Sequence, residues 1–416
     1  MSAQGHDRGL MAWWRAGTPA GRRALVAGSL GWMLDSFDVM LYALVLAALM
    51  KDLGMAKFTA GMLGSATLVA SAVGGLVFGV VADRYGRTRA LISSILIYSV
   101  FTAACGFAQT VAQLAVFRVF LGLGMGGEWA SGAALVSETW SAEHRGKALG
   151  FMQSAWAIGY GLAALVVAVV MPVWGWRAVF FAGVLPALLT VWVQRRVEEP
   201  ALWRAARAAA PAARVRLSDV FRGALGRLTV AVTLMNACTM FAWWGFNQWI
   251  PAYLSLPAQE GGIGLSTRVM SGFIIAMQVG MWFGYVTFGF ISDRAGRRRA
   301  YVTYLVTAAV LMLAYSVTQQ PLALLVLGPV AAFFATGYFT GFGAVTAEIY
   351  PTEIRATAQG FTYNVGRIGS AIAPWAVGRL ADTHGFGAAF SLSAVAFVCA
   401  AVLWIWIPET RGRDLA

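Results

Sequence analysis

Five ionisable residues lie inside apolar stretches that are long enough to cross a membrane: Asp35, Asp38, Arg118, Glu128 and Arg367. A charge at the centre of a lone membrane helix costs about 2.5 to 3.5 kcal/mol on insertion scales, so each of these residues needs a partner or a water-filled cavity. The sequence therefore indicates all five as candidate functional residues.

The acidic residues suit proton coupling. Asp35 and Asp38 are three residues apart, which places both carboxylates on one face of a helix. Two acids this close repel each other, so one of them is protonated more readily than in water, as proton uptake and release require. Together with Glu128 they are the candidate proton-coupling residues. In an alternative interpretation, one Asp hydrogen-bonds a neighbouring helix and the other faces a cytoplasmic funnel.

Arg118 and Glu128 share one apolar stretch but are ten residues apart, about 15 Å along a helix axis, so they do not pair directly. A chain with Asp35 or Asp38, in which Arg118 lies on one side and Glu128 on the other, would satisfy all four charges. This chain is our hypothesis for the first half of the sequence.

Arg367 is the candidate substrate-binding cation, because a planar guanidinium with five donors matches a carboxylate. The alternative is a structural salt bridge to Asp35 or Asp38. Amides and aromatic residues in the other apolar stretches suit a small polar ligand with an apolar or ring-shaped body. With Arg118, these further candidate ligand contacts are Gln153, Trp156, Tyr160, Asn236, Trp244, Asn247, Gln248, Gln278, Tyr338, Tyr363 and Asn364.

The composition is that of a membrane protein. Of the 416 residues, 59% are apolar and 12% are charged, whereas about a quarter of an average soluble domain is charged. No nucleophile with a base, metal cluster or phosphate loop is recognisable, so we expect neither an enzyme nor a cofactor. The net charge of +13 comes from basic residues between apolar blocks, which is typical of cytoplasmic loops rather than of a nucleic-acid-binding surface.

Twelve apolar runs of membrane-spanning length predict an all-α protein of twelve transmembrane helices in two six-helix bundles. The runs begin near residues 24, 60, 90, 110, 147, 176, 227, 267, 300, 321, 357 and 387. We expect a cytoplasmic N-terminal segment (1–23), a first bundle (24–193), a cytoplasmic linker (194–226), a second bundle (227–407) and a cytoplasmic tail (408–416). The distribution of Arg and Lys places both termini in the cytoplasm.

The two halves repeat at a constant offset of 210 residues. GVVADRYGRTR begins at Gly79 and GFISDRAGRRR at Gly289, while Glu138 and Glu348 begin a second pair of matching segments. Such a duplication predicts two related six-helix units. Its charged residues are candidate gating latches between the bundles, or alternatively anchors for lipid headgroups: Asp83, Arg84, Arg87, Glu138, Arg145, Asp293, Arg294, Arg297, Glu348 and Arg355.

At these motifs the chain resembles the major facilitator superfamily, whose loop after the second helix carries the same Gly, Asp, Arg, Gly, Arg pattern in both halves. Within it, DSFD, RVFLGLGMGGEW, ETWSAEHRGKALG and NVGRIGSAIAP are similar to segments of the organic-anion proton symporters, which include sialate, lactate, aromatic-acid and metabolite carriers. The resemblance implies proton-coupled transport of a carboxylate by alternating access.

The leading hypothesis is an inner-membrane symporter that takes up a small organic anion with protons. It would work as a monomer in the lipid bilayer, with the proton as its coupling ion and without nucleic acid. A proton-driven exporter of amphipathic compounds and a non-transporting membrane sensor or scaffold are the alternatives. Arg367 and Arg118 disfavour the exporter, and the lack of a recognisable output domain disfavours the sensor.

Overall fold

The computed structural model describes residues 12–201, 204 and 220–411. Almost all of them are helical, as the apolar runs predict. The helices are α1 (Ala12–Ala16), α2 (Pro19–Leu53), α3 (Lys57–Tyr85), α4 (Arg87–Cys105), α5 (Val111–Thr139), α6 (Ala142–Phe181), η1 (Ala182–Val184), α7 (Leu185–Arg196), α9 (Ala224–Ser255), η3 (Ala258–Glu260), α10 (Thr267–Ala295), α11 (Arg297–Val317), α12 (Pro321–Thr336), α13 (Phe339–Ile349) and α14 (Thr352–Leu403).

Two long helices contain a reversal that completes the predicted membrane crossings. In the described part of the chain, ten helical stretches are long and apolar enough to span a membrane. Gly175 (φ 75°, ψ 178°) interrupts α6, and Gly385 (φ 79°, ψ 171°) interrupts α14. Glycine adopts such angles without a Cβ clash, so the chain can turn back at each site. The two glycines are 210 residues apart, so the repeat holds for the backbone. Each of the two stretches that contain a reversal crosses twice, so the ten stretches give the twelve predicted crossings.

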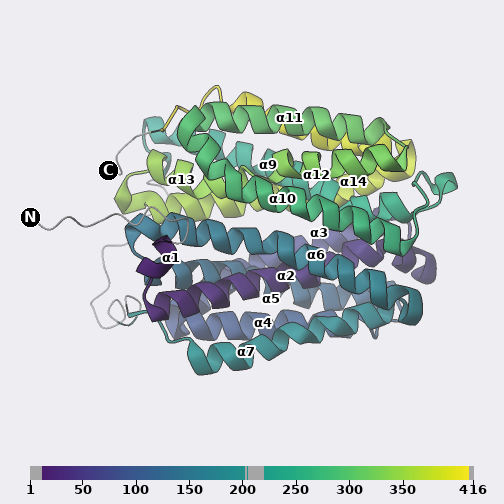
Figure 1. The fold of residues 1–416 in the computed structure, drawn as a ribbon, viewed down its shortest axis with the longest axis horizontal. Coiled ribbons are helices and arrows are strands. Elements are labelled where there is room, and N and C mark those ends of the chain that lie inside the picture. The colour runs from purple at the N-terminus through teal and green to yellow at the C-terminus, as the bar shows by residue number, and fades with distance from the viewer. Residues whose placement is uncertain (1–11, 202–203, 205–219, 412–416) are drawn as a thin grey trace, which may run out of the picture.

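The two halves lie side by side along their length (Figure 1), with α2 to α7 in one layer and α9 to α14 in the other. At the seam between them, α3 packs on α14, α6 on α10 and α2 on α9. The outer surface carries large apolar side chains such as Leu76, Leu188 and Val317, which are 65%, 67% and 80% exposed. An apolar exterior around a buried polar interior suits a protein whose solvent is lipid.

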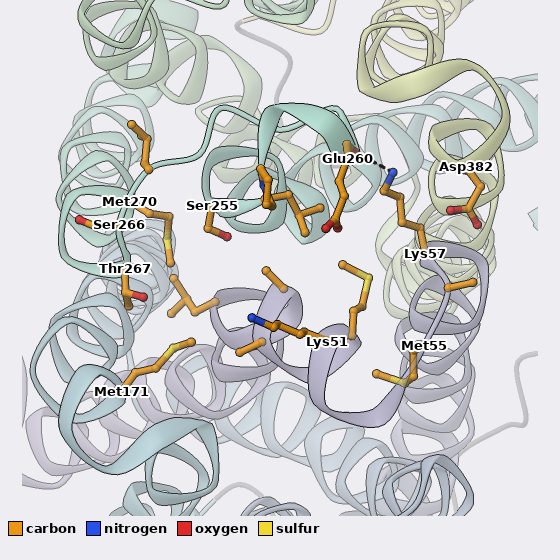
Figure 2. Close-up of a pocket in the computed structure, with 18 residues that line it drawn as sticks. Lys51, Met55, Lys57, Met171, Ser255, Glu260, Ser266, Thr267, Met270 and Asp382 are labelled. Atoms are coloured by element: carbon orange, nitrogen blue, oxygen red, sulfur yellow. Dashed lines mark hydrogen bonds between the residues drawn. The ribbon is translucent and has the colours of Figure 1, made fainter.

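Two ends of the bundle are distinguished by their loops. We call the end at which α3 meets α4 (residues 84–89) and α10 meets α11 (residues 294–299) the arginine-rich end. At the opposite end, Lys57 donates from Nζ to the Glu260 carbonyl across the seam (3.0 Å), and the Phe58 amide donates to Oδ2 of Asp382 (2.7 Å). A cavity of about 640 Å³ lies between the halves at this opposite end (Figure 2).

Candidate functional site

The five charged residues singled out in the sequence are all buried inside the bundle. Asp35 and Asp38 of α2, Arg118 and Glu128 of α5, and Arg367 of α14 are at most 8% exposed. Four of them come from the first half, and Arg367 comes from the second. None of the five forms an ion pair with another of them within the described residues. The contacts around each of them therefore differ from those of a salt bridge.

Asp38 forms a hydrogen bond within the first half of the chain. Its Oδ2 accepts a hydrogen bond from Thr102 Oγ1 of α4 (3.0 Å), while Oδ1 lies against Gly183 of η1. This geometry matches the alternative in which one of the two acids hydrogen-bonds a neighbouring helix. Oδ2 of Asp35, one helical turn earlier, has no hydrogen-bond partner among the described residues.

Glu128 is buried without a hydrogen bond to either carboxylate oxygen in the described part of the chain. Its carboxylate lies directly against Gly31 of α2, where a Cβ would collide with it. Gly31 therefore allows α2 and α5 to approach closely enough to enclose this acid. A buried ionised carboxylate that lacks hydrogen-bond donors is costly.

Arg118 packs against an aromatic ring of α2. Its guanidinium carbon is 3.6 Å from the centre of the Tyr42 ring, a cation–π contact, and its Nε and Nη1 have no hydrogen-bond partner among the described residues. The order agrees with the predicted chain, since both Asp residues lie between Arg118 and Glu128, but no ion pair joins Arg118 to an acid among the described residues. This order follows from the antiparallel packing of α2 and α5, which sets Glu128 beside Gly31 and Arg118 beside Tyr42, with both Asp residues between these levels.

Arg367 reaches the seam from α14. Its guanidinium carbon lies 5.8 Å from the centre of the Tyr363 ring, and its Nη1 is near Gly75 of α3 in the other half. Its charge acts on Asp35 of the other half, although no ion pair joins the two among the described residues. Asp35 also interacts electrostatically with Glu128. The structure thus brings Asp35, Glu128 and Arg367 into one electrostatic group across the seam.

An aromatic cluster lines the seam beside this group. The Trp129 ring stacks on the Tyr363 ring of the other half (centroids 4.5 Å apart, 10° between planes), and Trp156 meets Trp244 across the seam at 6.0 Å. Trp32 joins them, 4.6 Å from Trp156 and 6.5 Å from Trp129. Trp32 and Trp129 were not predicted from the sequence, although they stand three residues before Asp35 and directly after Glu128.

The remaining polar candidates divide into two groups. At the seam, Asn247 Nδ2 lies 3.3 Å from the Met40 sulfur. Gln248 faces Gly64 of the opposite half, and Gln278 faces Gly161. Gln153 faces Tyr285 of the opposite half. These four side chains can contact a ligand held between the halves.

The hydrogen bonds and ring contacts of the second group lie within one half of the chain. Asn236 donates to the Thr362 carbonyl (3.3 Å) and Asn364 to the Gly360 carbonyl (2.9 Å) of α14. Tyr338 packs against other aromatic residues of the second half, and Tyr160 is fully buried in α6. Asn236 and Asn364 are thus bonded within the second half, whereas the hydroxyls of Tyr160 and Tyr338 have no hydrogen-bond partner among the described residues, and all four stay predictions as ligand contacts.

A polar cluster holds the arginine-rich end of the first half. Arg87 Nη2 pairs with Glu138 Oε1 at 3.0 Å, which joins α4 to α5. Glu199, which follows α7, accepts from the backbone amides of Thr88 (3.1 Å) and Arg89 (3.3 Å). A carboxylate at a helix N-terminus binds the free amides and complements the helix dipole.

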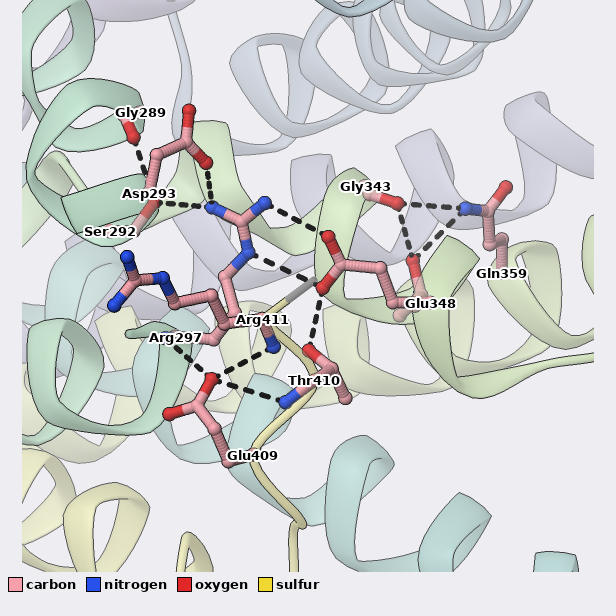
Figure 3. A network of polar contacts seen from close by, with 11 residues as sticks. Gly289, Ser292, Asp293, Arg297, Gly343, Glu348, Gln359, Glu409, Thr410 and Arg411 are labelled. Atoms are coloured by element: carbon pink, nitrogen blue, oxygen red, sulfur yellow. Dashed lines mark hydrogen bonds and ion pairs between the residues drawn. The ribbon is translucent and has the colours of Figure 1, made fainter. Parts of the chain in front are cut away.

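The second half repeats this cluster at the same offset (Figure 3). Arg297 pairs with Glu348 (2.9 Å) and with Asp293 of the preceding helix. Glu409, which follows α14, accepts from the backbone amides of Arg297 (2.8 Å) and Arg298 (3.1 Å). Each half therefore ties its loop, a helix end and the segment after its last helix together.

The ion pairs Arg87–Glu138, Arg297–Asp293 and Arg297–Glu348 each lie within one half. Arg84 contacts the ring of Tyr85, and Arg294 is exposed. The side chains of Asp83, Arg145 and Arg355 lie outside the described residues. Glu199 and Glu409 were missed from the sequence, but the 210-residue offset that relates them is the signal that could have found them.

The cap formed by Glu409 predicts a dependence of stability on pH. Partial burial raises the pKa of the Glu409 carboxyl, but backbone amides of Arg411, Arg297, Arg298 and Thr410 outweigh it and hold the pKa below its usual value. A lowered pKa stabilises the fold above the unfolded-state pKa, and this stabilisation is lost as the pH falls through the folded-state value.

We therefore expect Glu409→Gln to lower the thermal midpoint of the purified protein at pH 7 by about 1 to 3 °C, since caps contribute roughly 1 kcal/mol. The difference from wild type should shrink below about pH 4, near the unfolded-state value for Glu. Glu198→Gln, which removes an exposed charge without this cap, is the control. Equal midpoints for wild type and Glu409→Gln at pH 7 would contradict the cap.

Comparison with known proteins identifies the family. The Major Facilitator Superfamily matches residues 28–283 and 256–415. A probable 4-methylmuconolactone transporter of Cupriavidus pinatubonensis is 35% identical, covering 97% of this chain and 94% of the relative. A cis,cis-muconate transport protein of Acinetobacter baylyi is 32% identical (95% and 97% covered), and a sialic acid transporter of Escherichia coli is 30% identical (95% and 96% covered).

A solved structure shares the fold. A D-xylose–proton symporter superposes with a TM-score of 0.75 at 19% identity, covering 94% of this chain and 99% of that one. The matched family spans both halves, as the repeat requires. The chain belongs to the major facilitator superfamily and is a multi-pass membrane transport protein rather than an enzyme.

Proposed function

We propose that this chain is a proton-coupled symporter that carries a small organic anion into a bacterial cell across the inner membrane. The arginine-rich end and both termini are then cytoplasmic, because basic residues concentrate in the loops of that end. The chain works as a monomer, by alternating access of its two halves. The relatives named for muconate and sialic acid carry carboxylates, which supports an organic anion as substrate.

The observation that carries this proposal is Arg367, a buried cation at the seam that has no ion-pair partner among the described residues. Asp35 is the neighbouring acid from the other half. While Asp35 is ionised, its charge partly compensates that of Arg367. Once Asp35 takes up a proton, the guanidinium is left to bind a substrate carboxylate. Anion binding and proton binding are thereby linked at one place between the halves.

The aromatic cluster supports a planar substrate body. Trp129 and Tyr363 stack nearly parallel across the seam, so a flat ring or a conjugated chain can stack against the aromatic surface of this pair. Tyr363 lies below the guanidinium of Arg367. A carboxylate bound to Arg367 therefore places its attached ring beside this pair.

Trp129→Leu should weaken binding of a planar acid, because it removes the stacking surface and leaves a smaller apolar side chain. We expect about a three- to tenfold higher dissociation constant for benzoate, and a smaller change for cyclohexanecarboxylate, which cannot stack. Calorimetry on purified protein measures both. Trp174→Leu, which replaces an exposed Trp outside the seam, is the control. An equal change for the two acids would refute a stacking role.

Uptake of labelled carboxylates into proteoliposomes tests the proposed function directly. An inward-directed pH gradient should drive accumulation of the substrate above its external concentration. A monoanion that enters with one proton moves no net charge, whereas each additional proton adds about 2.3 kcal/mol of drive per 100 mV. We expect electroneutral uptake, so a voltage imposed at equal pH should drive no accumulation. Accumulation by voltage alone would require a second proton, and outward movement under every gradient would indicate an exporter.

A further inference from the structure

The charged residues of the cavity at the opposite end lie several helical turns from the seam group. The cavity is lined by the end of α2, the start of α3, η3 and the start of α10. Lys51 is 16 residues after Asp35 in α2, and Asp382 is 15 residues after Arg367 in α14. At 1.5 Å per residue, Lys51 and Asp382 are about 20 to 25 Å along their helices from Asp35 and Arg367, whereas the inner wall of the cavity at Leu44, nine residues after Asp35, is about 14 Å from it.

The walls of this cavity are suited to an amphipathic ligand. Its volume of about 640 Å³ is within the range of small-molecule sites. Met50, Met55, Met171 and Met270 supply apolar surface from both halves, and methionine side chains adapt to ligands of different shape. Ser266 and Thr267 add hydroxyl groups at the first turn of α10.

Four charged residues line the cavity, and two of them already have partners. Lys57 donates to the Glu260 carbonyl and lies over the Phe386 ring, while Asp382 accepts from the Phe58 amide. These contacts join the two halves.

The other two charges are available to a ligand. Figure 2 shows the Lys51 ammonium and the Glu260 carboxylate reaching into the cavity from opposite walls. Neither group has a hydrogen-bond or ion-pair partner among the described residues. The start of α10 adds the positive end of a 29-residue helix beside this space.

We propose that this cavity is a second, outer binding site for an amphipathic monocarboxylate, with Lys51 as its cation. The carboxylate lies between Lys51 and the first turn of α10, and the apolar body lies on the methionines. Glu260 on the opposite wall repels a second negative charge, so the site favours monoanions over dianions. This inference rests on the proposed function for its substrate class, and the site captures the anion before it reaches Arg367.

Cysteine protection tests this site without any transport. Ala48 lines the cavity, so Ala48→Cys should react with a membrane-impermeant maleimide, and benzoate should slow the reaction. Lys51→Gln should raise the benzoate concentration needed for half-protection by about tenfold, because a charge-assisted contact is lost. Glu260→Gln should lower it. Benzyl alcohol, which lacks the carboxylate, should give little protection.

A control variant distinguishes a binding site that uses Lys51 from a general effect of positive charge near the cavity. Arg268→Gln removes the same charge from an exposed residue of α10 that does not line the cavity, so benzoate protection should be unchanged. Lack of protection by benzoate, or equal protection in wild type and Lys51→Gln, would overturn the proposal. The same assay in an Arg367→Lys background should still show protection, so failure of the seam site and failure of this outer site are distinguishable.

Discussion

Arg367→Lys is expected to raise the dissociation constant for a carboxylate substrate by about 10- to 100-fold while the protein remains folded and inserted. The guanidinium offers two parallel donors to a carboxylate, whereas a lysine ammonium acts as a point charge. Arg367 also has no ion-pair partner among the described residues, so Lys does not break an existing bridge. A structural cation, by contrast, should tolerate Lys without loss of substrate affinity.

Calorimetry on purified wild type and Arg367→Lys, with a carboxylate that wild type transports, measures this change. Arg177→Lys is the control, because Arg177 pairs with Asp52 in an exposed position of the first half. Arg118→Lys is the informative comparison, since Arg118 contacts Tyr42 and none of the acids. Near-equal affinities for wild type and Arg367→Lys would refute the contact of two parallel guanidinium donors with the carboxylate. A loss of affinity in Arg118→Lys alone would place the anion site at Arg118 of α5.

The sequence predicts which charges are buried, because an ionisable residue in the middle of an apolar helix must face the interior of the bundle to avoid the lipid. It cannot predict their partners. Whether Arg118 meets an acid or Tyr42 depends on the offset between α2 and α5, which close contact at Gly31 determines. Similarly, the Thr102 hydroxyl that binds Asp38 comes from α4, 64 residues away. Such offsets arise from packing between helices rather than from the periodicity of one helix.

The repeat allows more to be predicted than periodicity alone. The crossings, the reversals at Gly175 and Gly385, and the paired clusters at the arginine-rich end all follow the 210-residue offset. The seam departs from this symmetry, because Arg367 and the acids have no charged counterparts in the other half. A transporter that binds one substrate between two related halves requires different chemistry on each side, and this difference is visible in the sequence before any contact is known.

Amide substitution of the seam acids should uncouple the substrate from the proton. Asp35→Asn and Glu128→Gln keep the size of each side chain but cannot exchange a proton. Both acids lie in the electrostatic group of Arg367, so we expect each variant to lose concentrative uptake. A one-unit pH gradient coupled to one proton supports about tenfold accumulation, and these variants should only equilibrate the substrate. Asp38→Asn should have the smaller effect, because Thr102 already binds Asp38 within the first half.

Two measurements on the same proteoliposomes separate uncoupling from misfolding. Counterflow exchanges labelled for unlabelled substrate without net proton movement, so it should persist in Asp35→Asn and Glu128→Gln while accumulation is lost. Asp52→Asn, in the exposed pair with Arg177, should accumulate substrate as wild type does. If Asp35→Asn, Asp38→Asn and Glu128→Gln all accumulate substrate normally, the proton is carried elsewhere. If counterflow disappears together with accumulation, the substituted acid is needed for the conformational change or for binding. The electrostatic interaction between Asp35 and Arg367 is then the first interaction to test.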